Sequence, residues 1–192
     1  MMMATVVLLS GCATTPPRNI NNACAIVQQY PDWYYDSLAS YKKWGVPISV
    51  QFAIIRKESS FIADAKPPMQ YALGFIPVGR PTSAYGYAQA VDGTWSDYQK
   101  ETGNGWASRS NFADAVDFIG WYGNMANRMA GVSRDNAYAL YLAYYGGVGS
   151  YINRSYHADA TVRGYANQTQ KWAYTYARQL KNCQVPAKGW FW

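Results

Sequence analysis

Several residue types are scarce in this chain of 192 residues, and each scarcity excludes something. A single histidine, His157, argues against a histidine-based metal site, so we expect no metal and no cofactor. Only 15% of the residues are charged whereas 49% are hydrophobic, which excludes a disordered chain. No apolar run approaches the roughly 20 residues that span a bilayer, so no transmembrane helix is expected. A P-loop, a GxGxxG turn and a CxxC pair are absent from the sequence.

Aromatic and basic residues are the abundant ones. The chain has 18 Tyr and 8 Trp, which suits proteins that bind sugars or flat rings but also suits a packed core. Lys and Arg number 17 against 11 Asp and Glu, a formal net charge of +6. Such a charge attracts nucleic acid, anionic lipid or another anionic polymer. Because the basic residues form no dense run, we expect no nucleic-acid partner.

Apolar periodicity predicts a mainly α fold. Helices are expected at residues 31–41, 48–60, 94–102, 112–130, 136–145 and 162–180. Residues 61–81 contain six Pro or Gly residues, which interrupt helices and strands, so a long loop is predicted at 67–81. That loop either closes over a binding groove or packs without a function of its own. No strand of useful length is predicted.

The N-terminus resembles a targeting sequence. Leu9-Ser10-Gly11-Cys12 follows a short apolar segment and looks like a bacterial lipobox, although the segment lacks a basic start and a stray Cys is the alternative. We therefore expect a signal peptide at 1–11, a lipid on Cys12 and a tether over 12–29. A folded domain at 30–183 and a tail at 184–192 complete the organisation. Ala13 is not the residue that holds lipoproteins at the inner membrane, so the expected location is the periplasmic side of the outer membrane.

The cysteine count becomes informative once Cys12 is set aside. Three cysteines are present, and the two that remain, Cys24 and Cys183, bracket the expected domain. An oxidising compartment favours a disulfide between them, and two free buried thiols are the alternative.

Glu58 is the most informative acidic residue. It is one of two glutamates, and Ile54 and Ile55 lie one helical turn before it, so it projects from the apolar face of its helix. Burial and a nearby helix C-terminus both raise a carboxyl pKa, as a general acid requires. Two alternatives remain: an ion pair with Arg56 or Lys57, or a place in the last, exposed turn of the helix. The other glutamate, Glu101, lies in a polar helix end and is expected to be solvated.

Three segments around Glu58 and beyond it carry a family resemblance. Residues 58–61 (ESSF) look like the Glu-Ser-x-Phe motif of lytic transglycosylases with the goose-type-lysozyme-like SLT fold. Residues 84–89 (AYGYAQ) resemble the family's Gly-Leu-Met-Gln motif, and residues 142–149 (LAYYGGVG) resemble Ala-Tyr-Asn-x-Gly-x-Gly. The three occur in the family's order. The resemblance implies a lysozyme-like helical domain with a substrate groove, in which 67–81 is longer than usual.

The resemblance also implies a reaction. The enzyme would cleave the β-1,4 bond between N-acetylmuramic acid and N-acetylglucosamine in peptidoglycan, with Glu58 as the single general acid and base, and leave a 1,6-anhydro sugar. Two alternatives stay open: a lysozyme-type hydrolase, and a non-catalytic glycan-binding envelope lipoprotein. Hydrolysis would need a second carboxylate, for which the candidates are Asp64, Asp92, Asp114 and Asp117.

Supporting roles follow from the motifs. The resemblance implies that Ser59 positions substrate, that Gln89 binds an N-acetyl group, and that Tyr144 places its hydroxyl against Glu58. Gly86 would allow close approach of the glycan. Two departures stand out: Tyr145 replaces the family Asn, and Tyr87 with Ala88 replaces Leu-Met and would reshape the groove floor. Four aromatic residues are candidate sugar platforms: Tyr85, Trp95, Trp106 and Tyr145.

Overall fold

The computed structural model describes residues 14–188. The predicted signal peptide, Cys12 and the last four residues of the predicted tail lie outside that range. The elements, in chain order, are α1 (Ala23–Gln29), α2 (Pro31–Trp44), α3 (Ile48–Ser59), β1 (Gln70–Ala72), β2 (Ile76–Gly79), α4 (Asp92–Thr102), α5 (Phe112–Ala130), α6 (Ala137–Gly146), α7 (Val148–Ile152), a short 3-10 turn (Ser155–Ala158) and α8 (Ala160–Lys181). The prediction of a mainly α fold is confirmed.

The helix boundaries follow from ordinary capping chemistry. Asn111 begins α5 by accepting a hydrogen bond from the backbone N–H of Asp114, and Gly131 ends it in the left-handed conformation. Asp159 begins α8 in the same way through Val162. Because these caps are local, the sequence places both helices within two residues of where they lie.

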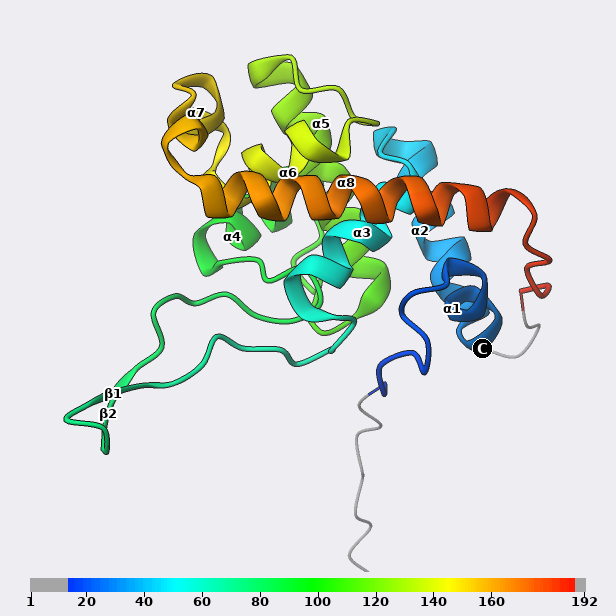
Figure 1. The fold of residues 1–192 in the computed structure, drawn as a ribbon. Coiled ribbons are helices and arrows are strands. Elements are labelled where there is room, and N and C mark those ends of the chain that lie inside the picture. The colour runs from blue at the N-terminus through cyan, green and yellow to red at the C-terminus, as the bar shows by residue number, and fades with distance from the viewer. Residues whose placement is uncertain (1–13, 189–192) are drawn as a thin grey trace, which may run out of the picture.

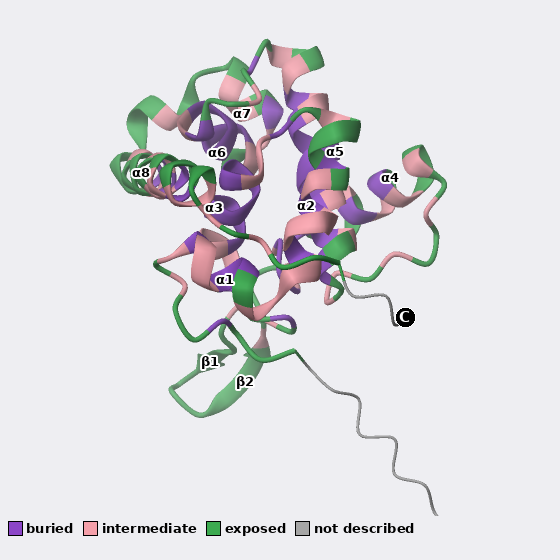
Figure 2. Ribbon diagram, turned by 90° about the vertical axis from the view of Figure 1, so that its right-hand side faces the viewer, coloured by how far each residue is buried: buried purple, intermediate pink, exposed green. Residues whose placement is uncertain are grey.

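The helices pack around one core, and the buried residues of α3 and α5 lie at its centre. Helix α8 lies across α3 and α6 on one side, and α2 packs along α5 on the other (Figure 1). The faces that α3, α5 and α6 turn toward one another are the buried ones (Figure 2). No helix within residues 14–188 is long and apolar enough to cross a membrane.

The folded domain begins earlier than predicted. Residues 23–29, expected in the tether, form α1, and Ala23, Ile26 and Val27 are fully buried. The backbone N–H of Ala23 donates to Gln179 Oε1 over 2.8 Å, which attaches α1 to α8. A seven-residue helix has too few turns to reveal its apolar face as a periodic pattern, so sequence reasoning missed it.

A disulfide joins Cys24 of α1 to Cys183, just after α8. The two Cα atoms lie 5.4 Å apart across a sequence separation of 159 residues. The bond therefore joins the two ends of the domain, as the cysteine arithmetic favoured.

The long loop contains a β-hairpin, which the sequence analysis did not predict. Strands β1 and β2 are antiparallel, with Tyr71 opposite Pro77, and Leu73 and Gly74 both take positive φ in the turn. The hairpin projects away from the helices (Figure 1). It therefore neither covers the groove described below nor packs on the core.

Candidate active site

A groove of about 530 Å³ opens beside the C-terminal end of α3. It is bounded by the loop that follows the hairpin, by α4 and α5, and by the end of α6. Its lining comprises Glu58, Thr82, Ala84, Gln89, Ala90, Val91, Thr94, Phe118, Tyr122, Tyr144, Tyr145, Gly146 and Gly147. The tertiary structure thus brings one residue or more from each of the three predicted motifs to a single surface.

Glu58 lies in the last turn of α3, which ends where Ser60 adopts φ 51°. Burial raises the pKa of its carboxyl from the ordinary 4.5 to about 7, while contact with the Tyr141 hydroxyl and the charge of Lys57 act in the opposite direction. Its Oε1 atom is buried and has no hydrogen-bond partner among residues 14–188. A carboxyl in this state holds a proton near neutral pH that no protein acceptor takes up.

The basic neighbours of Glu58 are engaged elsewhere. The Arg56 guanidinium lies 4.0 Å from the centre of the Trp172 ring and donates to the Tyr176 hydroxyl over 3.2 Å. The Lys57 ammonium lies 3.5 Å from the centre of the Tyr165 ring. Because both cations face α8, neither forms an ion pair with Glu58, and the ion-pair alternative for this glutamate is wrong.

Two tyrosines of α6 lie near Glu58, whereas the resemblance implied a role for Tyr144 alone. The Tyr144 hydroxyl donates to the carbonyl of Ala88 over 2.6 Å, so its proton is not directed at Glu58, although burial and the Glu58 charge both raise its pKa. Tyr141, one helical turn earlier and buried, interacts with the Glu58 carboxyl instead, and burial together with that carboxyl raises the pKa of its hydroxyl. The spacing of three residues along one helix face was the available clue, but it does not say which hydroxyl reaches the acid.

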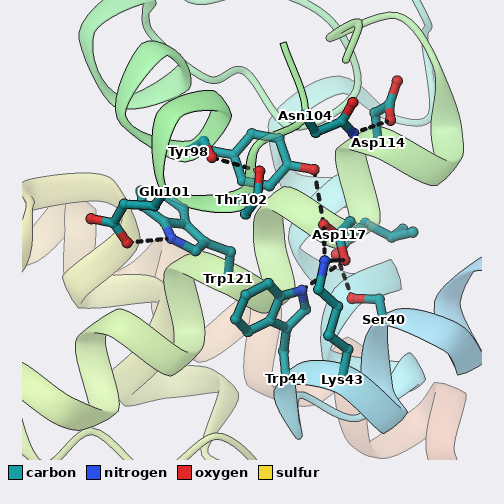
Figure 3. A network of polar contacts seen from close by, with 11 residues as sticks. Ser40, Lys43, Trp44, Tyr98, Glu101, Thr102, Asn104, Asp114, Asp117 and Trp121 are labelled. Carbon is teal, nitrogen blue, oxygen red and sulfur yellow. Dashed lines mark hydrogen bonds and ion pairs between the residues drawn. The ribbon is translucent and has the colours of Figure 1, made fainter. Parts of the chain in front are cut away.

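Asp117 belongs to a structural network on the far side of α5. Its carboxylate accepts from Trp44 Nε1 over 2.7 Å and from the Tyr98 hydroxyl over 2.9 Å, and pairs with Lys43 at 3.1 Å (Figure 3). These contacts tie α2 and α4 to α5. The carboxylate is fully used in holding helices together and is not available as a second acid in the groove.

The other candidate acids also lie outside the groove. Asp114 accepts from Asn104 and from the backbone N–H of Ser108, and Asp92 pairs with Arg109 at 2.8 Å. Asp64 is exposed and does not line the groove. Among the lining residues that the structure describes, Glu58 is therefore the one carboxyl group.

Glu101 is exposed, as expected, but its carboxylate also has a structural partner. Its Oε2 accepts from Trp121 Nε1 over 2.9 Å, which fixes the end of α4 on α5 (Figure 3). The partner lies 20 residues along the chain, beyond the reach of local patterns.

The second motif is built around two unusual backbone positions. Gly86 has φ 77°, and a Cβ there would lie 2.0 Å from the carbonyl oxygen of Arg109. Glycine is thus required by the approach of that carbonyl, which corrects the expectation that the glycan approaches it. Gln89 has φ 48° and its amide Nε2 donates to the carbonyls of Ala65 and Gly86, each over 2.9 Å. These bonds hold its side chain at the groove.

Several other predicted site residues lie elsewhere. The Ser59 hydroxyl donates to the Ile55 carbonyl over 3.2 Å and is buried, and Tyr85 lies between Lys66 and Arg109 outside the lining. Among the four candidate platforms, Tyr145 lines the groove and is 55% exposed. Trp95 is packed in the core and Trp106 is exposed outside the groove.

Trp33 is a supporting residue that sequence reasoning missed. Its ring stacks on Phe112 at 4.0 Å between centroids and also packs against Phe61 and Tyr87. Because Phe61 is the last residue of the first motif and Tyr87 lies in the second, this one ring fixes both motifs against α5. Tyr87 is consequently a core residue, and the expectation that it reshapes the groove floor is wrong.

The fold is mainly helical, and its groove contains one carboxyl group among the described lining residues. These features together define a lysozyme-like domain. A family model described as "Transglycosylase SLT domain" matches residues 1–183, and the chain belongs to that family. Among solved structures, the chain is similar to lytic transglycosylase Slt of Pseudomonas aeruginosa in an inactive mutant form, at 21% identity and a TM-score of 0.56. The match covers 79% of this chain and 25% of that one, so this chain spans only a part of that protein. A search of curated proteins finds no significant match.

The raised pKa of Glu58 predicts a pH-dependent cost to stability. Between pH 4.5 and about 7 the folded protein holds a proton that the unfolded chain releases, so stability falls as pH rises through that window. Glu58→Gln does not titrate. The stability of the variant relative to the parent should therefore increase across the window and level off above it, with a change in unfolding free energy of at most about 3.4 kcal/mol. Thermal melts at a series of pH values measure this, and a difference that stays constant would contradict the enclosed, protonated state.

Proposed function

We propose that this domain is a peptidoglycan lytic transglycosylase that cleaves the β-1,4 bond between N-acetylmuramic acid and N-acetylglucosamine, with Glu58 as the one acid and base. The observation that carries the proposal is the groove itself, in which Glu58 is the sole carboxyl among the described lining residues and has a raised pKa. Hydrolysis by a carboxylate pair needs a second carboxyl across the scissile bond. A single carboxyl suits a reaction whose nucleophile is already part of the substrate.

The proposed reaction balances without water. The protonated Glu58 carboxyl gives its proton to the glycosidic oxygen, and the bond between that oxygen and C1 of the muramoyl sugar breaks with positive charge developing at C1. The Glu58 carboxylate then takes the proton of the 6-hydroxyl of the same sugar, while the oxygen of that hydroxyl bonds to C1. The products are a 1,6-anhydromuramoyl end and a free 4-hydroxyl on N-acetylglucosamine, and Glu58 is protonated again.

Other groove residues would bind the substrate and hold the acid. Gln89 donates both amide hydrogens to backbone carbonyls, which leaves its Oε1 to accept from an N-acetyl N–H group. Tyr145 offers an exposed ring at the groove wall to a sugar face. Tyr141 steadies the Glu58 carboxyl from the buried side.

The comparison with the Slt enzyme adds support of a limited kind. The solved form of that protein is inactive and carries glutamine in place of a glutamate. Loss of one carboxyl proton is thus enough to inactivate a protein of similar fold, as the proposal requires of Glu58.

Analysis of the products by mass spectrometry tests this function against its alternatives. Purified peptidoglycan is digested with the protein, and the released muropeptides are weighed. We expect anhydro ends, each one water lighter than a reducing end. Reducing ends would establish a lysozyme-type hydrolase instead, and no release would favour a non-catalytic glycan-binding protein.

We also propose that the chain is a lipoprotein of the cell envelope, anchored through Cys12 to the outer membrane on its periplasmic side. The lipobox-like sequence supports this, and so does the disulfide between Cys24 and Cys183, because disulfides persist in oxidising compartments. Cys12→Ser should remove the lipid from the N-terminus, which the mass of the intact protein measures.

A further inference from the structure

The hairpin at residues 67–79, named the apolar hairpin below, exposes most of its hydrophobic side chains. Leu73 is 82% exposed, Phe75 72%, Val78 61% and Tyr71 55%. The segment contains no Asp, Glu, Lys or Arg. In Figure 2 both strands are coloured as exposed, and in Figure 1 they stand clear of every helix. A surface of this kind is covered in use, because monomeric proteins rarely leave a contiguous apolar patch in water.

Both faces of the apolar hairpin are exposed, so whatever covers the hairpin has to contact both of them. Side chains on a strand alternate between the two faces, and every residue from 69 to 78 is exposed. Tyr71 lies opposite Pro77 and Ala72 lies opposite Ile76, so the exposed side chains of the two strands divide between both faces of the ribbon. A protein partner docks on one face of such a ribbon and leaves the other in water. A lipid layer surrounds both faces at once.

The edges of the hairpin point to the same environment. Strands that end a sheet in water are normally protected by charged side chains against pairing with other chains. Neither β1 nor β2 carries one. The hairpin limits such pairing by other means, since both strands are short, β2 contains Pro77 and a bulge interrupts the register between Gln70 and Tyr71. The absence of charge leaves the strands without an ionic group that would oppose entry into the interfacial layer of a membrane.

The base of the hairpin carries positive charge and is fixed to the domain. Lys66 and Arg80 flank it and are both exposed. The Arg80 guanidinium donates to the carbonyl of Pro67 and closes the base. The Lys66 ammonium lies 5.3 Å from the centre of the Tyr85 ring, which belongs to the second motif. The apolar part is therefore held out from the groove wall above a pair of cations.

We propose that the apolar hairpin inserts into the surface layer of an anionic bilayer, with Lys66 and Arg80 at the level of the headgroups. Phosphate-bearing headgroups complement the two cations, and the acyl boundary takes up Leu73 and Phe75. Insertion is shallow, of the order of 5–10 Å, because the outer edges of a two-stranded ribbon leave backbone groups without partners that hydrocarbon cannot satisfy.

This contact would set how the groove faces the membrane. The first described residues, at 14–22, and the apolar hairpin lie toward the same end of the molecule in both views (Figures 1 and 2). Thr82 and Ala84, just beyond the hairpin, line the groove. A hairpin inserted in the bilayer surface therefore holds the groove close to the lipid. The proposal depends neither on the reaction assigned to Glu58 nor on a lipid at Cys12.

A fluorophore placed on the hairpin tests the proposal locally. The full chain with Cys12→Ser has its other two cysteines joined, so Phe75→Cys provides a single thiol for an environment-sensitive dye. Trp106→Cys, at a position 98% exposed, provides the matched control. With vesicles of phosphatidylcholine and phosphatidylglycerol, we expect a blue shift and a several-fold rise in emission at position 75 and no change at 106. The response should weaken with salt and on phosphatidylcholine alone.

Three outcomes would overturn it: unchanged emission at position 75, an equal change at both positions, or a change at 75 without vesicles. A response to purified peptidoglycan alone would identify the cell wall as what the hairpin contacts. A response to rising protein concentration alone would identify a second copy of the chain.

Affinity measurements with a second pair of variants keep the test independent of labelling. Leu73→Ser with Phe75→Ser should lower partitioning to the anionic vesicles by roughly tenfold or more. Met129→Ser with Ile152→Ser removes two exposed apolar side chains elsewhere and should leave partitioning unchanged. The hairpin variant should keep the parent's melting temperature and its products on isolated peptidoglycan. Equal partitioning of the two double variants would refute membrane insertion, whatever the reaction proves to be.

Discussion

Glu58→Gln is expected to lower the rate of muropeptide release by about 10²- to 10⁴-fold, the range that general acid–base catalysis contributes. The substitution keeps the volume of the side chain but removes the proton that the leaving oxygen needs. Because the groove has no second carboxyl among its described lining residues, nothing nearby can take over. Quantitative mass spectrometry of anhydro-muropeptides over time measures the loss.

Glu101→Gln is the matched control, since it changes the chain's other glutamate in the same way. Glu101 accepts a hydrogen bond from Trp121 outside the groove, and a glutamine oxygen can still accept it. We expect activity within about threefold of the parent, because only one buried hydrogen bond is weakened. Full activity of Glu58→Gln, or an equal loss in both variants, would remove Glu58 from the mechanism.

Loss of the Cys24–Cys183 disulfide should have the largest effect on stability. The bond closes nearly the whole domain, and the chain-entropy model gives a stabilisation of up to about 5 kcal/mol for so long a loop. Cys24→Ser with Cys183→Ser should therefore melt well below the parent in non-reducing buffer. The first region to open should be α1, because the disulfide is the one covalent link between it and the end of α8, whereas hydrogen bonds such as that from Ala23 to Gln179 and the burial of its apolar face remain as weaker attachments.

The reducing condition supplies the control for that prediction. With a strong reductant the parent also lacks the bond, so the two proteins should melt at nearly the same temperature. If the double variant remains less stable than the reduced parent by a similar amount, the loss comes from placing serine hydroxyls at these two half-buried positions and not from the cross-link.

Local chemistry made much of this protein predictable. Helix α5 could be assigned to residue precision because Asn111, Gly131 and a regular apolar stripe all act within a few residues of one another. The acid could be found for a similar reason, since a glutamate on an apolar helix face is anomalous whatever surrounds it. By contrast, α1 and the β-hairpin have too few residues for a pattern to emerge.

The sequence by itself determined the mainly helical fold, the three motifs in their order, and Glu58 as the candidate acid. Only the tertiary structure decided that Tyr141 contacts the Glu58 carboxyl while the Tyr144 hydroxyl donates to Ala88, because that depends on how α6 is rotated against α3. It also decided that the carbonyl of Arg109 is what requires glycine at position 86. Both outcomes depend on contacts between residues far apart in the chain, and spacing along the chain does not settle which of those contacts form.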